Sequence, residues 1–295
     1  MAFYQKKKWK KELMDNTLLG YNQNLFVLPF DHRSSFVKLF GFADANLNPQ
    51  EQKIVAEAKE IIYDAFKKAV SETIPKEQAA ILIDEEYGDE IITDAKSKNY
   101  NVILTTEKSG QEEFAFEYGS AFGEHIEKYK PTFVKALIRY KSNANWDNLK
   151  TLSDYCHQNG YKFLLEVLSE INTPNAQNMV PIISALQELG IEPDVWKLEG
   201  MEKSIDYQQV IEKIQEGQRT SVGLVILGRG ENREKVEQWI RMGRDVRGVI
   251  GFAIGRTIFL NPIMDYNNHK ITKEEAITQI SANFQYFYRL FIKAI

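Results

Sequence analysis

The stretch Pro193-Asp194-Val195-Trp196-Lys197-Leu198-Glu199-Gly200 places a lysine inside a short apolar run. A run of this length, bounded by proline and glycine, is typical of a buried strand. An ammonium group buried without a partner is costly, and the amine tends to become neutral instead. Schiff-base chemistry with a carbonyl compound requires such a neutral, protected amine. The alternative is a structural lysine that pairs with Glu199 at the strand end.

The same kind of apolar run recurs along the chain. Eight runs are expected to be strands, at residues 25–30, 80–83, 102–105, 133–138, 162–165, 195–198, 222–227 and 248–252. The amphipathic segments between and after them are expected to be helices, among them residues 49–71, 146–157, 179–189, 207–215, 233–242 and 273–293. Alternating strands and helices predict βαβ units around a parallel sheet.

Eight such units without a linker predict a single α/β domain, a (β/α)8 TIM barrel over residues 1–295. The competing architecture is a doubly wound open sheet, which normally has a Gly-rich phosphate turn after its first strand. The first expected strand instead ends in Pro29-Phe30-Asp31-His32-Arg33, without glycine. Within the barrel domain we expect a basic arm or helix at residues 1–22 and a closing helix at 273–295. Residues 37–75 are expected to form an insertion with more than one helix.

The composition fits an ordinary globular protein. The 295 residues are 43% hydrophobic and 26% charged, with a formal net charge of −4. This mild acidity argues against a nucleic-acid partner, for which a concentrated basic face is expected. The lysines at residues 6–11 form a local basic cluster, and no apolar stretch follows it, so we expect neither a signal peptide nor a membrane anchor. The lone cysteine, Cys156, is expected to be structural and suits a reducing cytoplasm.

In barrel enzymes the active site is built at the carboxyl ends of the strands. Charged residues occupy nearly all of these positions here. Strand by strand, they are Asp31 and Arg33; Asp84, Glu85 and Glu86; Glu107 and Lys108; Lys135 and Arg139; Glu166; Lys197 and Glu199; Arg229; and Arg256, preceded by Gly255.

Charge inside the strands is the more specific signal. Because side chains alternate along a strand, Lys135, Leu137 and Arg139 share one face, and we expect Lys135 to point into the barrel. Repulsion from Lys135 and Arg139 would favour the neutral, nucleophilic form of Lys197. Glu166 would move the protons needed to form and collapse a carbinolamine. The alternative is a structural Lys–Glu–Lys network inside the barrel.

Two glycine-bearing segments end the last two expected strands. They are Leu227-Gly228-Arg229-Gly230 and Ile254-Gly255-Arg256. Loops after strands seven and eight of many barrels bind phosphate through backbone N–H groups. Glycine lets the backbone approach the anion, and arginine adds bidentate contacts. The pair of segments therefore predicts a phosphate site.

Other features leave alternatives open. The acidic residues Asp84, Glu85 and Glu86 would suit a divalent cation, but an acidic loop opposite a basic core explains them as well. His32 is a candidate for contact with a substrate. The aromatic residues at 284–291 are expected either to pack on the barrel or to form a subunit contact in a homo-oligomer.

Several of these motifs resemble a known family. The strings Phe30-Asp31-His32-Arg33, Asp84-Glu85-Glu86-Tyr87-Gly88, Trp196-Lys197-Leu198-Glu199-Gly200, Leu227-Gly228-Arg229-Gly230 and Gly251-Phe252-Ala253-Ile254-Gly255-Arg256-Thr257 look like the aldolase-like domain fused to the sugar kinase of inositol catabolism. That fusion is the 5-dehydro-2-deoxygluconokinase, and the kinase half is not seen in this chain. The domain is in turn similar to the class I tagatose-1,6-bisphosphate aldolases. The resemblance covers about residues 26–259.

The resemblance implies a TIM barrel and a carbon–carbon lyase that needs no metal or cofactor. It implies a Schiff-base lysine at Lys197, together with Lys135, Glu166 and Asp31 as catalytic residues. The implied reaction cleaves 5-dehydro-2-deoxygluconate 6-phosphate to dihydroxyacetone phosphate and malonate semialdehyde. His32 stands where the tagatose enzymes are expected to have glutamine, which leaves the choice of sugar open.

The expected substrate is therefore a phosphorylated keto-sugar. The residues expected to bind it or its phosphate are Arg33, Lys108, Arg139, Glu199, Gly228, Arg229, Gly255 and Arg256. A tagatose- or fructose-bisphosphate aldolase is one alternative. Two others are a metal-dependent sugar-phosphate isomerase using the Asp84–Glu86 carboxylates and a non-catalytic barrel that binds a sugar phosphate and regulates a partner.

Overall fold

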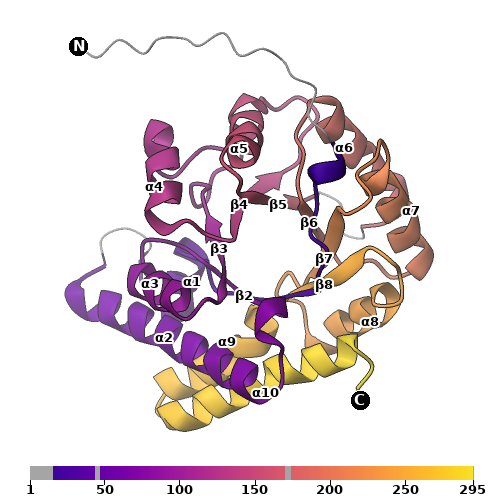
Figure 1. The fold of residues 1–295 in the computed structure, drawn as a ribbon. Coiled ribbons are helices and arrows are strands. Elements are labelled where there is room, and N and C mark those ends of the chain that lie inside the picture. The colour runs from indigo at the N-terminus through magenta and orange to yellow at the C-terminus, as the bar shows by residue number, and fades with distance from the viewer. Residues whose placement is uncertain (1–15, 44–46, 170–173, 295) are drawn as a thin grey trace, which may run out of the picture.

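The computed structural model describes residues 16–43, 47–169 and 174–294, so most of the expected arm at residues 1–22, including its lysines at 6–11, lies outside the described residues. Eight strands form a closed barrel in sequence order, and the ring of strands lies inside the helices (Figure 1). The strands are β1 (Leu25–Pro29), β2 (Ala79–Ile83), β3 (Asn101–Thr105), β4 (Phe133–Arg139), β5 (Lys162–Leu168), β6 (Val195–Glu199), β7 (Gly223–Leu227) and β8 (Val249–Ala253). The predicted TIM barrel is confirmed.

Every neighbouring pair of strands is parallel, including β8 with β1, which closes the ring. Alternation along the strands separates two apolar clusters. One fills the barrel and includes Val27, Phe133, Leu164 and Val195. The other packs between the barrel and the helices and includes the residues in between, such as Trp196. The inward face predicted for Lys135, Leu137 and Arg139 of β4 is confirmed, because all three line the cavity inside the barrel.

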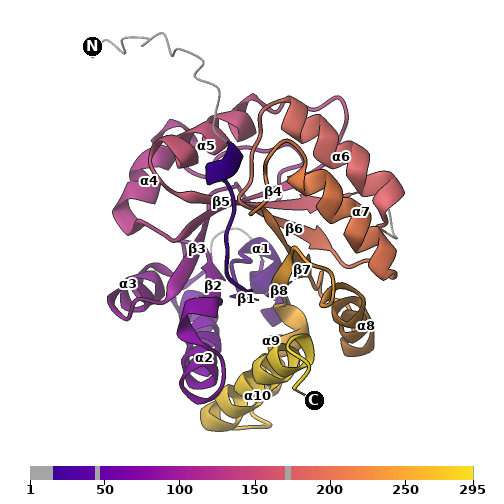
Figure 2. The same cartoon turned by 45° about the vertical axis from the view of Figure 1, so that its right-hand side comes forward.

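The helices surround the barrel (Figure 2). They are α1 (Ser34–Val37), α2 (Pro49–Glu72), α3 (Asp89–Ser97), α4 (Phe122–Tyr129), α5 (Asp147–Gln158), α6 (Ala176–Glu188), α7 (Ser204–Gln215), α8 (Arg233–Gly243), α9 (Arg256–Asn267) and α10 (Lys273–Phe291), with short 3-10 turns at Asn16–Leu18, Lys38–Phe40, Lys76–Gln78 and Gly119–Ala121. The insertion between β1 and β2 holds α1 and α2, as expected. No helix within these described ranges is both long and apolar enough to cross a membrane.

Helix α10 packs along α2, and both views place the two helices side by side. Its aromatic residues reach the barrel, where Tyr288 and Phe291 pack edge-on against Phe26 of β1. The aromatic residues near the end of the chain were expected either to pack on the barrel or to form a subunit contact. The observed packing corresponds to the first alternative.

The amino-terminal end of the barrel is closed by the segment that precedes β1. Asp194, which is fully buried just before β6, accepts hydrogen bonds from the backbone N–H of Gly20 and of Phe163, each at 2.8 Å. The ring of Tyr21 packs edge-on against Phe133 inside the barrel, with their centroids 5.0 Å apart. With this end closed, a cavity that reaches the barrel interior opens at the carboxyl ends of the strands.

Candidate active site

A cavity of about 470 Å³ lies at the carboxyl ends of the strands. It is lined by ten residues of the predicted site, namely Asp31, Arg33, Lys108, Lys135, Arg139, Glu166, Lys197, Arg229, Gly255 and Arg256. Gly228 and Glu199 are not among its lining residues. Glu199 instead lies behind Arg229, as described below.

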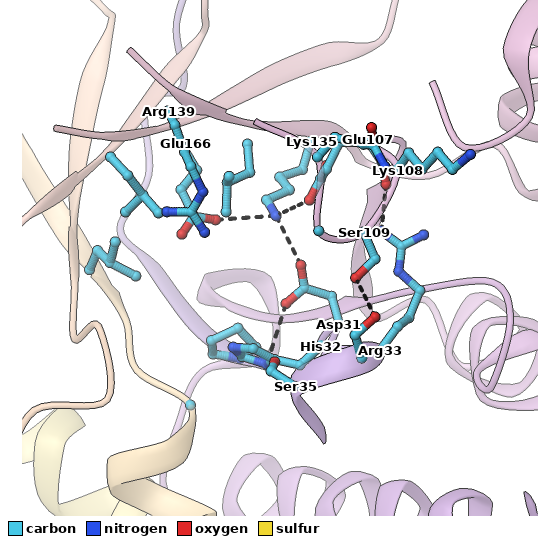
Figure 3. A pocket seen from close by; sticks show the side chains of 18 of the residues that line it. Asp31, His32, Arg33, Ser35, Glu107, Lys108, Ser109, Lys135, Arg139 and Glu166 are labelled. Atoms are coloured by element: carbon cyan, nitrogen blue, oxygen red, sulfur yellow. Dashed lines mark hydrogen bonds and ion pairs between the residues drawn. The ribbon is translucent and has the colours of Figure 1, made fainter. Parts of the chain in front are cut away.

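Lys135 is the centre of a buried charge network (Figure 3). Its Nζ lies 3.0 Å from Oδ2 of Asp31, 2.5 Å from Oε1 of Glu107 and 3.2 Å from Oε2 of Glu166. Only 1% of Lys135 is exposed, so the three carboxylates replace the water that the ammonium has lost. As predicted, Lys135 points into the barrel.

Lys197 is joined to the same network through one shared oxygen. Its Nζ donates to Oε2 of Glu166 at 2.8 Å, the oxygen that also lies near Lys135. Glu166 and Lys197 are paired in the register of β5 and β6, which places the two side chains next to each other on the inner face. Lys197 is 3% exposed and lines the cavity. The structural alternative of a pair with Glu199 is not found in the described contacts.

The expected repulsion between the two lysines is modified by the carboxylate between them. Burial opposes the charged form of Lys135, but Asp31, Glu107 and Glu166 together outweigh burial and raise its pKa. Burial likewise acts against ionised Glu166 and Asp31. The neighbouring lysines outweigh it and lower the pKa of both carboxyls, with His32 also contributing at Asp31. The network thus holds ionised carboxylates and a charged Lys135 beside Lys197.

His32 lines the cavity next to Asp31. Burial lowers its pKa to about 4, and Arg256 and Lys197 act in the same direction, while Asp31 opposes them. Its Nδ1 is buried and has no hydrogen-bond partner among the described residues. His32 is therefore neutral at pH 7, with its Nδ1 at 3.9 Å from Oδ1 of Asp31.

Glu107 belongs to the network, although it was not selected among the predicted site residues. The signal was available, because Ile103, Thr105 and Glu107 continue the two-residue period of β3 beyond its last residue. Choosing the neighbouring Lys108 as the site residue overlooked this alternation. Lys108 is exposed and lines the cavity, and in Figure 3 it extends away from Lys135.

Arg33 lines the cavity, but the two terminal nitrogens of its guanidinium are occupied. It pairs with the carboxylate of Glu117 and donates to the backbone carbonyl of Glu107. Both partners belong to a small hairpin after β3, which is closed by the hydrogen bonds from Lys108 N to Ala115 O at 2.8 Å and from Glu117 N to Thr106 O at 2.9 Å. Arg33 therefore fixes the wall of the cavity.

Arg139 ends β4 at the mouth of the cavity and is exposed. It shares the inner face of the strand with Lys135 and Leu137, as predicted, and all three line the cavity. Its position leaves the guanidinium accessible to a molecule that enters from solvent.

On the opposite side, the connections after β7 and β8 interlock. Arg229 pairs with Oε1 of Glu199, a residue that is only 2% exposed, and Arg256 donates to the carbonyl oxygen of Arg229 at 2.8 Å. Arg229 (φ +51°) and Gly230 (φ +76°) both have left-handed backbone. A side chain at Gly230 would lie within 2.5 Å of the Arg256 guanidinium. Glu199 thus positions Arg229 at the cavity, and Gly230 leaves room for Arg256.

The acidic segment after β2 is engaged outside this cavity. Asp84 forms a buried ion pair with Lys59 of α2. Glu85 pairs with His125 at 2.6 Å and with Lys128 at 3.1 Å, both on α4. Within residues 16–43, 47–169 and 174–294 there is no group of three or more His, Cys, Asp or Glu side chains arranged to hold a metal ion. These contacts explain Asp84 and Glu85 as anchors for helices.

Known structures share this fold. Cgl0159 from Corynebacterium glutamicum is 15% identical, with a TM-score of 0.54 over 94% of this chain and 88% of that one. An archaeal fructose 1,6-bisphosphate aldolase is 12% identical, with a TM-score of 0.58 over 92% of this chain and 95% of that one. At these identities, the likeness establishes a common barrel fold.

No curated protein matches the sequence. A family match covers residues 15–294, which is nearly the whole chain and includes every strand of the barrel. On that match, the chain belongs to the family described as "Uncharacterized protein conserved in bacteria (DUF2090)".

Proposed function

We propose that this protein is a class I aldolase, a carbon–carbon lyase that acts on a phosphorylated keto-sugar through a Schiff base at Lys197. The observation that carries the proposal is the buried Lys197 amine, which lines the cavity and is hydrogen-bonded to Glu166 at 2.8 Å. A nucleophilic amine next to a proton-transfer group is what imine formation requires.

The proposed reaction starts with Lys197 in its neutral form. Nζ attacks the ketone carbon to give a carbinolamine, and Glu166, which holds the proton taken from Lys197, gives that proton to the hydroxyl, which leaves as water. In the resulting iminium, the bond between the α carbon and the β carbon, which carries a hydroxyl group, breaks. Its electron pair moves toward the iminium to form an enamine. Asp31 takes the proton of the substrate hydroxyl, which becomes the aldehyde. Protonation of the enamine carbon and hydrolysis then release the ketone product.

The charges of the network support these roles. Lys135 stays charged among its carboxylates, so it can keep Glu166 and Asp31 ionised and ready to accept protons. Lys197 contacts only one of those carboxylates, that of Glu166, in the described contacts. The amine that must become neutral is thus the one with fewer anionic partners.

The phosphate is assigned to the connections after β7 and β8. Arg229 and Arg256 line the cavity there, with Gly255 beside them at the start of α9. Backbone N–H groups at a helix start and two guanidinium groups are suited to a dianion. We assign the other end of the substrate to the side of β3 and β4, where Lys108 and Arg139 lie.

For the substrate we propose 5-dehydro-2-deoxygluconate 6-phosphate, cleaved to dihydroxyacetone phosphate and malonate semialdehyde. This choice rests on the resemblance of the five motifs to the domain of the inositol-catabolism kinase. The second candidate is fructose or tagatose 1,6-bisphosphate, which is favoured by the structural likeness to the archaeal fructose 1,6-bisphosphate aldolase. Both candidates share dihydroxyacetone phosphate as the product that stays on the lysine.

That shared product gives a test that does not depend on the aldehyde. Incubation with dihydroxyacetone phosphate and borohydride should attach a reduced adduct to Lys197, identified by peptide mass spectrometry. In D2O, the same complex should exchange one hydrogen on the hydroxymethyl carbon of dihydroxyacetone phosphate, followed by NMR, because the enamine forms and is reprotonated by solvent.

The Lys197→Met variant should lose both signals, whereas Lys150→Met on the outer helix α5 should keep them. A wild-type protein that gives no adduct and no exchange, or an adduct that persists in Lys197→Met, would rule out the proposed mechanism. Cleavage assays with the candidate sugars then identify the aldehyde half. Binding without any turnover across that panel would instead favour the regulatory alternative.

A further inference from the structure

Glu107 contacts the network differently from the residues assigned to the reaction. One carboxylate oxygen, Oε1, accepts from Lys135 at 2.5 Å. The other, Oε2, is shielded from solvent and has no hydrogen-bond partner among the described residues. Glu107 as a whole is 8% exposed. Glu107 lines the cavity, but Oε1 is engaged by Lys135 and Oε2 is shielded, so we expect this carboxylate to act on a substrate through Lys135.

The neighbours of Lys135 compete for its hydrogen bonds. Its ammonium is hydrogen-bonded to Asp31 and Glu107, and Glu166 approaches it at 3.2 Å while its hydrogen bond is to Lys197. If Glu107 lost its charge, Lys135 would keep its own charge and turn to the remaining carboxylates. Glu166 is already close enough for Lys135 to attract it away from Lys197.

We propose that Glu107 is a positioning residue that occupies Lys135 and thereby leaves the Glu166 carboxylate to Lys197. The inference rests on the proposed function, in which Glu166 transfers protons, and it identifies Glu107 as the residue that keeps Glu166 in place. The backbone of Glu107 is held in place, as this role requires. Arg33 donates to the backbone carbonyl of Glu107 and also pairs with Glu117 across the hairpin. The hairpin thus sets the reach of the Glu107 side chain toward Lys135.

Glu107→Gln tests this assignment in the hydrogen–deuterium exchange of dihydroxyacetone phosphate. General acid–base catalysis contributes about 10²- to 10⁴-fold to rates, and displacing the group should lose part of it. We expect kcat for exchange to fall about tenfold or more and KM to stay within about twofold of wild type, because the phosphate contacts are untouched. Glu107→Asp, which restores the charge on a shorter side chain, should recover part of the rate.

The matched control is Glu192→Gln, which also removes a buried, ion-paired carboxylate. Glu192 is 6% exposed and binds Arg219 at 2.6 Å just before β6, at the closed end of the barrel. This variant should lose stability but retain the exchange rate. If Glu107→Gln does not fold by circular dichroism, Glu107→Asp alone decides: a slowed kcat with unchanged KM supports the role, and wild-type kinetics overturn it.

The outcomes separate the two proposals. If wild type forms no adduct and shows no exchange, the proposed function fails and this inference fails with it. If wild type exchanges and Glu107→Gln does so at the same rate, only the inference is overturned. A tenfold rise in KM without a change in kcat would also overturn it, because Glu107 would then act in binding.

Discussion

At the scale of single residues, the two central lysines differ by their partners. Lys135 faces three carboxylates and Lys197 faces one, although both are almost fully buried in the same barrel. Buried charges remain ionised only where opposite charges replace water. The difference in partners, rather than a difference in burial, distinguishes the two lysines, and the three carboxylates keep Lys135 charged.

His32 gives a residue-scale prediction for pH. Its pKa is lowered from 6.5 to about 4 in the folded protein, so the unfolded chain binds a proton between these values and the folded protein does not. Stability should therefore be fully present above about pH 6.5 and decrease as pH falls toward 4. In His32→Gln this contribution, on the order of 3 kcal/mol by pH 4, should disappear, as measured by urea unfolding at pH 4, 5 and 6.5.

The control for this prediction is His269→Asn, which removes an exposed histidine in the turn between α9 and α10. Asparagine tolerates the positive φ of +56° at this position. The control should keep the wild-type pH dependence. An unchanged pH dependence in His32→Gln would mean that His32 is hydrated and titrates normally.

At the scale of elements, the connections after β7 and β8 form one unit, because the Arg256 side chain after β8 is held by the connection after β7. Arg256 at the start of α9 reaches the carbonyl of Arg229, and Gly230 provides the space for it. This interlocking explains the glycine at position 230. It also links the two segments that were predicted to bind phosphate.

Gly230→Ala should disturb the connections after β7 and β8 and leave the rest of the fold unchanged. The added Cβ would collide with the Arg256 guanidinium at 2.5 Å, so Arg256 should move. A charged hydrogen bond contributes about 1.5–3 kcal/mol, so KM for dihydroxyacetone phosphate in the exchange assay should rise about tenfold or more. We expect kcat to change much less, since Lys197 and Glu166 remain in place.

Gly160→Ala is the matched control for backbone strain. Gly160 has the same φ of +76° in the turn before β5, and no atom lies within 4 Å of an added Cβ. It should carry the same conformational cost without an effect on KM. Equal KM values for wild type and Gly230→Ala would argue against a phosphate at Arg229 and Arg256.

At the scale of the whole molecule, the two ends of the barrel have different tasks. Asp194 closes the amino-terminal end, where it also pairs with Lys162 at 2.9 Å and lies 3.4 Å from His157. The carboxyl end holds the cavity and its charge network. Barrel enzymes commonly separate stability and chemistry in this way.

Asp194→Ala should therefore lower stability without slowing chemistry. Removal of a buried carboxylate with several hydrogen bonds should reduce the free energy of unfolding by about 3 kcal/mol, measured with urea. The folded variant should exchange dihydroxyacetone phosphate at the wild-type rate. The reverse result, a stable protein with slow exchange, would mean that the closed end is coupled to the cavity.

The eight strands and their inward faces could be predicted from the sequence, because apolar runs and two-residue alternation are local properties of the chain. Strand ends differ from the predicted ranges by at most three residues. The same alternation correctly placed Lys135 on the inner face of β4, where it lines the cavity. It would also have pointed to Glu107, had the period of β3 been followed beyond the strand end.

Pairing between charges was decided only by the tertiary structure. Asp84 and Asp31 both follow strands, yet Asp84 pairs with Lys59 of a helix while Asp31 joins Lys135 in the barrel. Arg33 binds a hairpin more than 70 residues away in sequence, and Glu199 forms an ion pair with Arg229. Such contacts depend on which chain segments meet in space, because a charged side chain pairs with the opposite charge that burial brings nearest.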